Sequence, residues 1–176
     1  MFFFFFITGL CVGSFLNVLI DRLPQEESPW GGRSHCDHCR KILTPLDLIP
    51  VVSYLWLGGK CRYCKKRLSW QYPLVELVTG MMFVGLYWYL YHNFQFSIFN
   101  FQFEFISLLI LFSSFLVIFL ADLKYQVIPD QMILVSMVAS LIYLFFLRNP
   151  LIMHLLSGTV TFGFFLCLFL LTRGRG

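Results

Sequence analysis

Long apolar runs constrain this chain more than any other feature. Short polar segments separate five such runs, which lie at residues 1–20, 74–92, 105–121, 131–147 and 151–172. A helix needs about 20 apolar residues to cross the hydrocarbon core of a bilayer, whereas a membrane β-strand is about half as long and alternates in polarity. With 59% hydrophobic and 12% charged residues, the chain is also too apolar for a soluble domain of this size. We therefore predict an all-α polytopic membrane protein with about five transmembrane helices in the lipid bilayer.

The basic residues predict the orientation of these spans. Of the 13 Lys and Arg residues, nine lie between the first and the second run, in the loop 21–73. Loops rich in Lys and Arg stay on the cytoplasmic side of a membrane, so this loop is expected to be cytoplasmic. Alternation of the spans then places the segment 122–130 on the same side and leaves only Arg148 outside.

The loop carries two C-x2-C pairs. Cys36 and Cys39 form the first pair, and Cys61 and Cys64 form the second after 21 intervening residues. Two such pairs can surround one tetrahedral Zn²⁺ ion, and four thiolates leave no open position for catalysis. The simplest interpretation is a zinc site that folds the loop. A membrane thiol oxidoreductase is an alternative, but its cysteines belong on the oxidising side of the membrane, opposite to this loop.

Three acidic residues lie at the ends of the predicted spans. Asp130 precedes the fourth run and can cap its first turn. Glu76 lies one turn inside the second run, where it can interact with the helix dipole or take part in function. Asp122 ends the third run, where the helix dipole disfavours a negative charge, so capping does not explain it. Asp122 is therefore the stronger candidate for a catalytic acid.

Several short motifs occur in an order that resembles a known family. They are GSFLNVLIDRLP at 13–24, the two C-x2-C pairs, GGKCRYC at 58–64, YPLVELVTG at 72–80 and DLKYQVIPD at 122–130. Each motif alone is a weak signal, but in this order they make the chain similar to the bacterial type IV prepilin peptidases from about residue 9 onward.

The resemblance implies a multi-pass enzyme of the bacterial cytoplasmic (inner) membrane with two activities. Such an enzyme cleaves the leader peptide of prepilins or pseudopilins and then methylates the new N-terminus with S-adenosylmethionine. Asp122 matches the first catalytic aspartate and would face the cytoplasm with the cysteine loop. Gly59 and Lys60 match the region linked to methyl transfer. The resemblance carries zinc ligation over to four residues, Cys36, Cys39, Cys61 and Cys64, and no nucleic-acid partner is expected.

One motif of the family is absent. Its second catalytic aspartate lies in a G-x-G-D motif, which these 176 residues do not contain. We therefore expect a chain truncated just before that motif and inactive as a peptidase by itself, with Asp130 as a less favoured substitute for the missing acid. The alternatives left open are the thiol oxidoreductase and a non-catalytic zinc-knuckle membrane protein. The expected parts are a transmembrane helix at 1–20, a methyltransferase-associated zinc-knuckle loop at 21–73 and a partial aspartyl peptidase membrane domain at 74–176.

Overall fold

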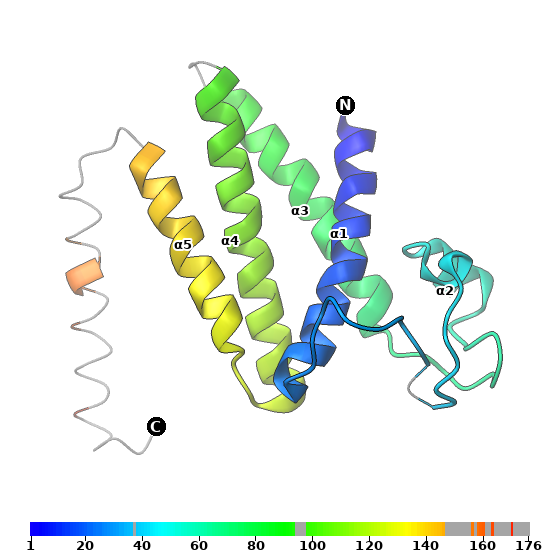
Figure 1. The fold of residues 1–176 in the computed structure, drawn as a ribbon. Coiled ribbons are helices and arrows are strands. Elements are labelled where there is room, and N and C mark those ends of the chain that lie inside the picture. Colours follow the sequence, from blue (N-terminus) through cyan, green and yellow to red (C-terminus); the bar gives the residue numbers. More distant parts are fainter. Residues whose placement is uncertain are drawn as a thin grey trace.

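Four long helices form the body of the protein. The computed structural model describes residues 1–36, 38–93 and 98–146, together with single positions between 156 and 170. The long helices lie roughly side by side (Figure 1) and are α1 (Phe2–Arg22), α3 (Gln71–Asn93), α4 (Ile98–Tyr125) and α5 (Asp130–Phe146). Within the described residues, β-structure is limited to two isolated bridges, so the predicted all-α class is confirmed.

Three of the long helices are apolar enough to cross a membrane. The sufficiently long apolar stretches are Phe2–Gln25, Gln71–His92 and Phe101–Tyr125, whereas the apolar part of α5, Asp130–Leu144, is shorter. These four helices correspond to the first four predicted spans. The fifth run, 151–172, falls outside the described residues except for single positions, so the predicted number of spans is tested only as far as α5.

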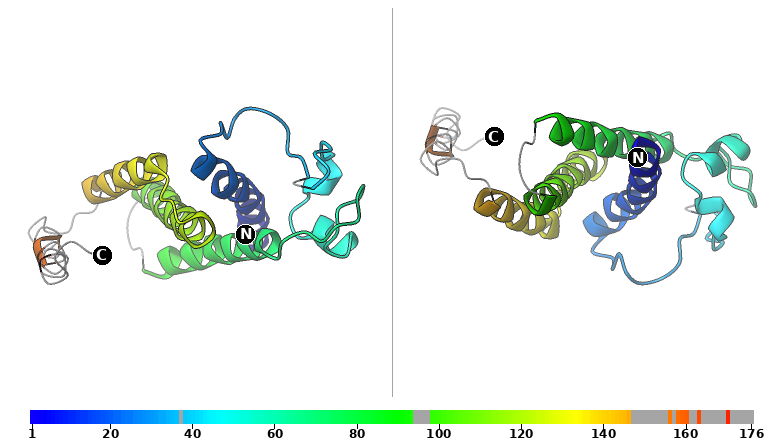
Figure 2. Two further views of the ribbon diagram at one scale, coloured as in Figure 1. Left: turned by 90° about the horizontal axis from the view of Figure 1, so that it is seen from below. Right: turned by 90° about the horizontal axis from the view of Figure 1, so that it is seen from above.

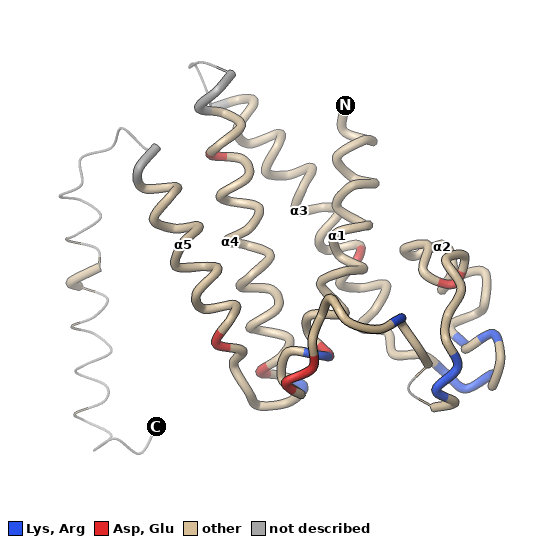
Figure 3. Tube along the Cα trace, viewed as in Figure 1, with Lys and Arg blue, Asp and Glu red and all other residues tan. Residues whose placement is uncertain are grey.

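The segment between α1 and α3 folds beside the helices. It contains η1 (Leu23–Gln25), η2 (Pro45–Leu48) and the short helix α2 (Val52–Trp56). In views along the bundle (Figure 2), this segment extends to one side of α1 and α3, away from α5. Lys and Arg gather in this segment, and acidic residues gather at the neighbouring helix ends (Figure 3).

The helices pack in two pairs, α1 with α3 and α4 with α5. One apolar cluster joins both pairs at the end where α1 finishes and α3 begins, and its buried members are Leu16, Ile20, Leu23, Val75, Val117 and Met132. A second cluster lies toward the other end of α3 and the start of α4, with Tyr87, Leu90, Phe105 and Leu108. The chain segments on either side of the loop are therefore held together by buried contacts.

Two glycines allow α1 and α3 to approach closely. A Cβ atom at Gly9 would lie 2.7 Å from the Cα atom of Gly80, and one at Gly13 would lie 2.7 Å from the Cα atom of Glu76. Small residues four positions apart commonly let membrane helices meet backbone to backbone. This packing places Glu76 directly against α1.

Candidate functional site

The two C-x2-C pairs form knuckles of the same backbone design. In the first, the amide of Cys36 donates to the carbonyl of Lys41, and Arg40 has a φ of 55°. In the second, the amide of Cys61 donates to the carbonyl of Lys66 in the same way, and Lys65 has a φ of 59°. The isolated bridges His35–Ile42 and Lys60–Arg67 close the two turns at matching positions. The loop thus contains a short structural repeat that the sequence analysis did not identify, although both pairs are followed by two basic residues.

The two knuckles bring four thiols together. The Sγ atoms of the four cysteines, Cys36, Cys39, Cys61 and Cys64, all lie within 4.8 Å of one another. Cys36 Sγ and Cys64 Sγ are 3.8 Å apart, which matches the separation of about 3.8 Å expected between thiolates bound to one tetrahedral zinc ion. The donor set therefore fits a metal ion with four sulfur ligands. His38 is exposed and does not join this group.

The Cys61 thiol is prepared for deprotonation. The backbone amide of Cys64 lowers the pKa of Cys61 to about 7, against burial, which acts in the opposite direction. A metal-bound cysteine is a thiolate, so a lowered thiol pKa favours metal binding near neutral pH.

An acidic residue links η2 to the second knuckle. Asp47 accepts hydrogen bonds from the backbone amide and the hydroxyl of Thr44, and it forms an ion pair with Arg62 at 2.6 Å. Its side chain is 2% exposed. Burial acts to raise the pKa of Asp47, but the bonds from Thr44 and Arg62 outweigh it and lower the pKa below the usual value. The carboxylate is thus held ionised as a fixed crosslink within the loop.

A second acidic residue anchors the loop to the helices. Glu76 is 7% exposed, and its Oε2 atom accepts the backbone amide of Val51 at 2.7 Å. Val51 precedes α2 and has a φ of 60°, an unusual conformation for a β-branched residue. Ser14 of α1 also hydrogen-bonds to the Glu76 carboxylate. Glu76 thus joins α1, α3 and the start of α2.

A third acidic residue, Asp21, connects three helices. It forms an ion pair with Lys124 of α4 at 2.6 Å and accepts hydrogen bonds from the hydroxyls of Tyr125 and Tyr72 at 3.3 and 3.1 Å. Asp21 lies within the motif GSFLNVLIDRLP at 13–24, and the sequence alone predicts no role for it. No local signal could have predicted one, because Lys124 is 103 residues away in sequence.

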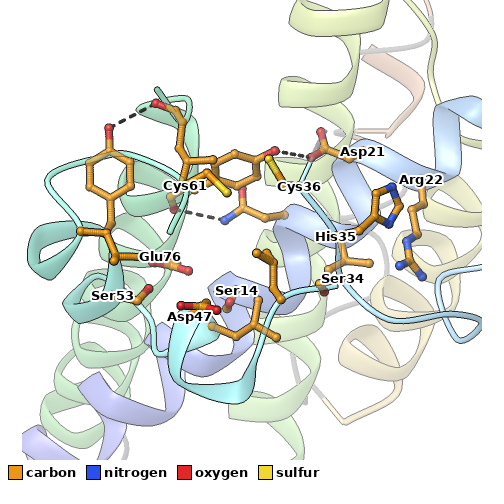
Figure 4. A pocket seen from close by; sticks show the side chains of 18 of the residues that line it. Ser14, Asp21, Arg22, Ser34, His35, Cys36, Asp47, Ser53, Cys61 and Glu76 are labelled. Atoms are coloured by element: carbon orange, nitrogen blue, oxygen red, sulfur yellow. Dashed lines mark hydrogen bonds between the residues drawn. The ribbon is translucent and has the colours of Figure 1, made fainter. Parts of the chain in front are cut away.

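A cavity of about 400 Å³ lies between the cysteine knuckles and the helices (Figure 4). Side chains of α1, α3, α4 and the loop line it, among them Asn17, Asp21, Glu76, Cys36 and Cys61. Polar groups of Ser14, Ser53, Asp47 and Glu76 converge on one part of it (Figure 4). A concave space of this size, with mixed polar and apolar walls and several convergent polar groups, can hold a small molecule.

Gly59 contacts the wall of this cavity indirectly. It has a φ of 67°, and a Cβ atom there would lie 2.9 Å from the hydroxyl oxygen of Tyr54, a residue that lines the cavity. The neighbouring Lys60 is exposed. The structure therefore places Gly59 as a support for Tyr54 and Lys60 on the surface of the second knuckle.

The two aspartates beyond α3 lie outside the cavity lining. Asp122 is exposed in the last turn of α4, and within the described residues its carboxylate has no ion pair or side-chain hydrogen bond. Asp130 is exposed and is the first residue of α5, whereas the sequence predicted it as the capping residue just before the helix. A difference of one position is within the usual uncertainty of helix ends. The structure does not bring Asp122 together with the cysteine cluster, so the two form separate candidate sites.

Comparison with known proteins gives a consistent match over the first half of the chain. Residues 7–90 match the family described as the bacterial peptidase A24 N-terminal domain. A prepilin leader peptidase/N-methyltransferase of Myxococcus xanthus is 49% identical over 80 residues, which cover 46% of this chain and 24% of the relative. The protein of the same name from Bacillus subtilis is 45% identical over 80 residues, which cover 46% of this chain and 32% of the relative. The protein of that name from Aeromonas hydrophila is 38% identical over 105 residues, which cover 46% of this chain and 36% of the relative. No solved structure matches the chain.

Proposed function

We propose that this chain, whose residues 7–90 match the bacterial peptidase A24 N-terminal domain, acts in leader removal and N-methylation of type IV prepilins. The matched relatives are prepilin leader peptidase/N-methyltransferases, and the matched regions span 24% to 36% of their lengths. The observation that carries the proposal is the placement of the four-cysteine cluster and most of the cavity lining within the matched residues; Lys124 and Tyr125 of α4 complete that lining.

The cysteine cluster has a structural role in this proposal. Its four thiolates would hold a zinc ion, and the bound ion would crosslink the two knuckles. Because all four positions are taken by the protein, the site has none left for a reacting group. The residues of the cluster act by keeping the loop closed over the cavity, and two of them, Cys36 and Cys61, contribute directly to its wall.

The cavity is the proposed site of methyl transfer. S-adenosylmethionine supplies a methyl group on a positively charged sulfur when it is bound. Cations are attracted to aromatic faces, and the cavity offers the rings of Tyr54 and Tyr72. Gly59 would influence methylation by allowing Tyr54 its position.

Asp122 is the proposed acid of leader cleavage. It lies in the last turn of α4, at the end of the bundle where the loop segment attaches, and its carboxylate is free to contact a substrate or a second acid. Two carboxylates that share a proton can activate water for peptide hydrolysis. The G-x-G-D motif implied by the resemblance would supply the second one.

The test is a cleavage assay on this chain extended by the C-terminal region of the Bacillus subtilis relative, joined after α5. Changing Asp122→Ala in this form is expected to abolish prepilin cleavage, a loss of at least about 100-fold for a general acid or base. The control Asp130→Ala removes an equally exposed acid eight residues away and should leave cleavage within about threefold of the unchanged protein, because surface substitutions have small effects. Cleavage that survives in the Asp122→Ala protein would show that another residue is the catalytic acid.

A further inference from the structure

The cavity lining carries four acidic and four basic side chains, but they are not all paired with one another. Asp21 pairs with Lys124, and Asp47 pairs with Arg62. Glu76 has no ion pair within the described part of the chain, although its side chain is nearly buried. A buried carboxylate without a cation is costly even when it accepts hydrogen bonds. Among the buried acidic side chains of the cavity, Glu76 is therefore the one that has no cationic partner in the described residues.

A second residue of the cavity lining has an unsatisfied polar atom. Asn17 lies on the facing helix α1, is 4% exposed and lines the same cavity. Its amide nitrogen donates to the carbonyl of Tyr72 at 3.1 Å, but its side-chain oxygen, Oδ1, accepts no hydrogen bond. Buried polar atoms nearly always have a partner. The unfilled acceptor on Asn17 thus points independently to a ligand that donates hydrogen bonds.

We propose that Glu76 and Asn17 together bind a primary ammonium group, and that this group is the free N-terminus of the polypeptide to be methylated. An ammonium carries one positive charge and three N–H donors, which suits one carboxylate and one amide oxygen. The remaining wall includes Leu43, Leu57 and Tyr54, which suit an apolar or aromatic first side chain. This inference rests on the proposed methyl transfer and identifies the residues that would position its acceptor.

The experiment measures ligand binding rather than methylation. The chain is placed in phosphatidylcholine nanodiscs and titrated with phenylalaninamide, which carries a free amine beside an aromatic ring, and with N-acetylphenylalaninamide, which has no charge. We expect only the free amine to bind, and we expect Glu76→Gln to weaken that binding about tenfold or more, as for other hydrogen bonds to charged groups. Glu76→Asp keeps the charge and should retain part of the affinity.

A matched control removes a carboxyl group elsewhere in the membrane-spanning region. Glu104 of α4 does not line the cavity, so Glu104→Gln should leave amine binding unchanged. Bound zinc and the unfolding temperature, measured for every variant, show whether the fold is intact.

Equal binding of the acetylated compound, or equal binding by Glu76→Gln, would overturn the proposal. Loss of amine binding in nanodiscs made with phosphatidylethanolamine would overturn the assignment to a polypeptide, because a lipid headgroup would then occupy the site. A chain that binds the amine but never methylates it would instead contradict only the proposed function.

A different observation carries a second inference, about the segment 45–56. Its surface is unusually apolar, with Leu46, Ile49, Val52, Leu55 and Trp56 all exposed. Leu55 is 71% exposed and Trp56 is 85% exposed. An apolar patch on this scale usually marks an interaction surface.

The position of this segment identifies what it contacts. Leu48 and Pro50 line a shallow hollow together with Cys11 and Phe15, which lie near the middle of the apolar span of α1. Figure 1 also shows α2 beside α1 rather than beyond its end. The segment is thus level with residues that a bilayer would surround.

We infer that η2 and α2 insert into the lipid leaflet on the side of the cysteine loop. Four exposed basic residues of the second knuckle suit anionic headgroups at the edge of that leaflet: Lys60, Lys65, Lys66 and Arg67.

Tryptophan fluorescence tests this insertion. The chain is placed in bilayers that contain lipids brominated midway along the acyl chain, and the emission lost in Trp56→Phe is taken as the signal of Trp56. We expect brominated lipid to quench that signal about as strongly as the signal lost in Trp88→Phe, which reports an exposed residue in the membrane span of α3. Aqueous iodide should quench neither. Quenching of Trp56 by iodide but not by brominated lipid would overturn the inference.

Discussion

Changing Cys61→Ser is expected to remove the bound zinc and unfold the loop. Cys61 is buried at the centre of the four-thiol cluster, and its amide also closes the second knuckle. Binding of zinc to such sites is worth about 10–16 kcal/mol, most of which is folding free energy of the loop. Metal analysis should fall from about one zinc per chain to none, and hydrogen exchange should become fast across residues 34–68. The membrane-spanning helices should remain protected, because their apolar clusters include no residue of the segment 34–68.

The matched control for this change is Cys11→Ser. Cys11 is an exposed cysteine on α1 that lies outside the cluster. The variant should keep its zinc and its slow exchange in the loop. Full zinc content in the Cys61→Ser protein would contradict the assignment of the ligands, whereas zinc loss in both variants would point to general damage by serine substitution.

Changing Gly13→Ala is expected to push α1 away from α3. The added Cβ atom would lie 2.7 Å from the Cα atom of Glu76, which is backbone and cannot rotate away. Overpacking of this kind costs about 1–3 kcal/mol. A lower unfolding temperature in detergent should therefore accompany a weaker contact between Glu76 and the loop, measured as faster hydrogen exchange at the Val51 amide.

Gly85→Ala provides the control, since it makes the same chemical change on α3. A Cβ atom at Gly85 would meet nothing within 4 Å. That variant should be unchanged or slightly more stable, because alanine favours a helix over glycine by about 0.5–1 kcal/mol. Equal effects of the two substitutions would mean that helix propensity, and not close packing of α1 on α3, decides the stability.

Local features of the sequence were sufficient to predict the long helices and the clustering of the four cysteines. The apolar runs at 1–20, 74–92, 105–121 and 131–147 became helices because each has the length and composition that only a helix can satisfy in a membrane. The four cysteines came together as their spacing indicated, since each C-x2-C turn already places two thiols side by side. The G-x3-G pattern of Gly9 and Gly13 is also local, and it is typical of close packing between membrane helices.

The tertiary structure decided which acidic residues have partners. Asp122 and Lys124 are near neighbours in sequence, yet Lys124 pairs with Asp21, 103 residues away. Glu76 could have been a simple helix-end charge, but it is buried against Ser14 and the Val51 amide. These contacts depend on how α1 packs against α3 and α4. The spacing of charged residues along a single helix predicts only contacts within that helix, so it carries no information about the packing between helices. The sequence by itself therefore determined the described helices and the clustering of the four cysteines, which follow from local composition and spacing. Only the fold determined the cavity and its unpaired carboxylate, because both arise where segments distant in sequence meet.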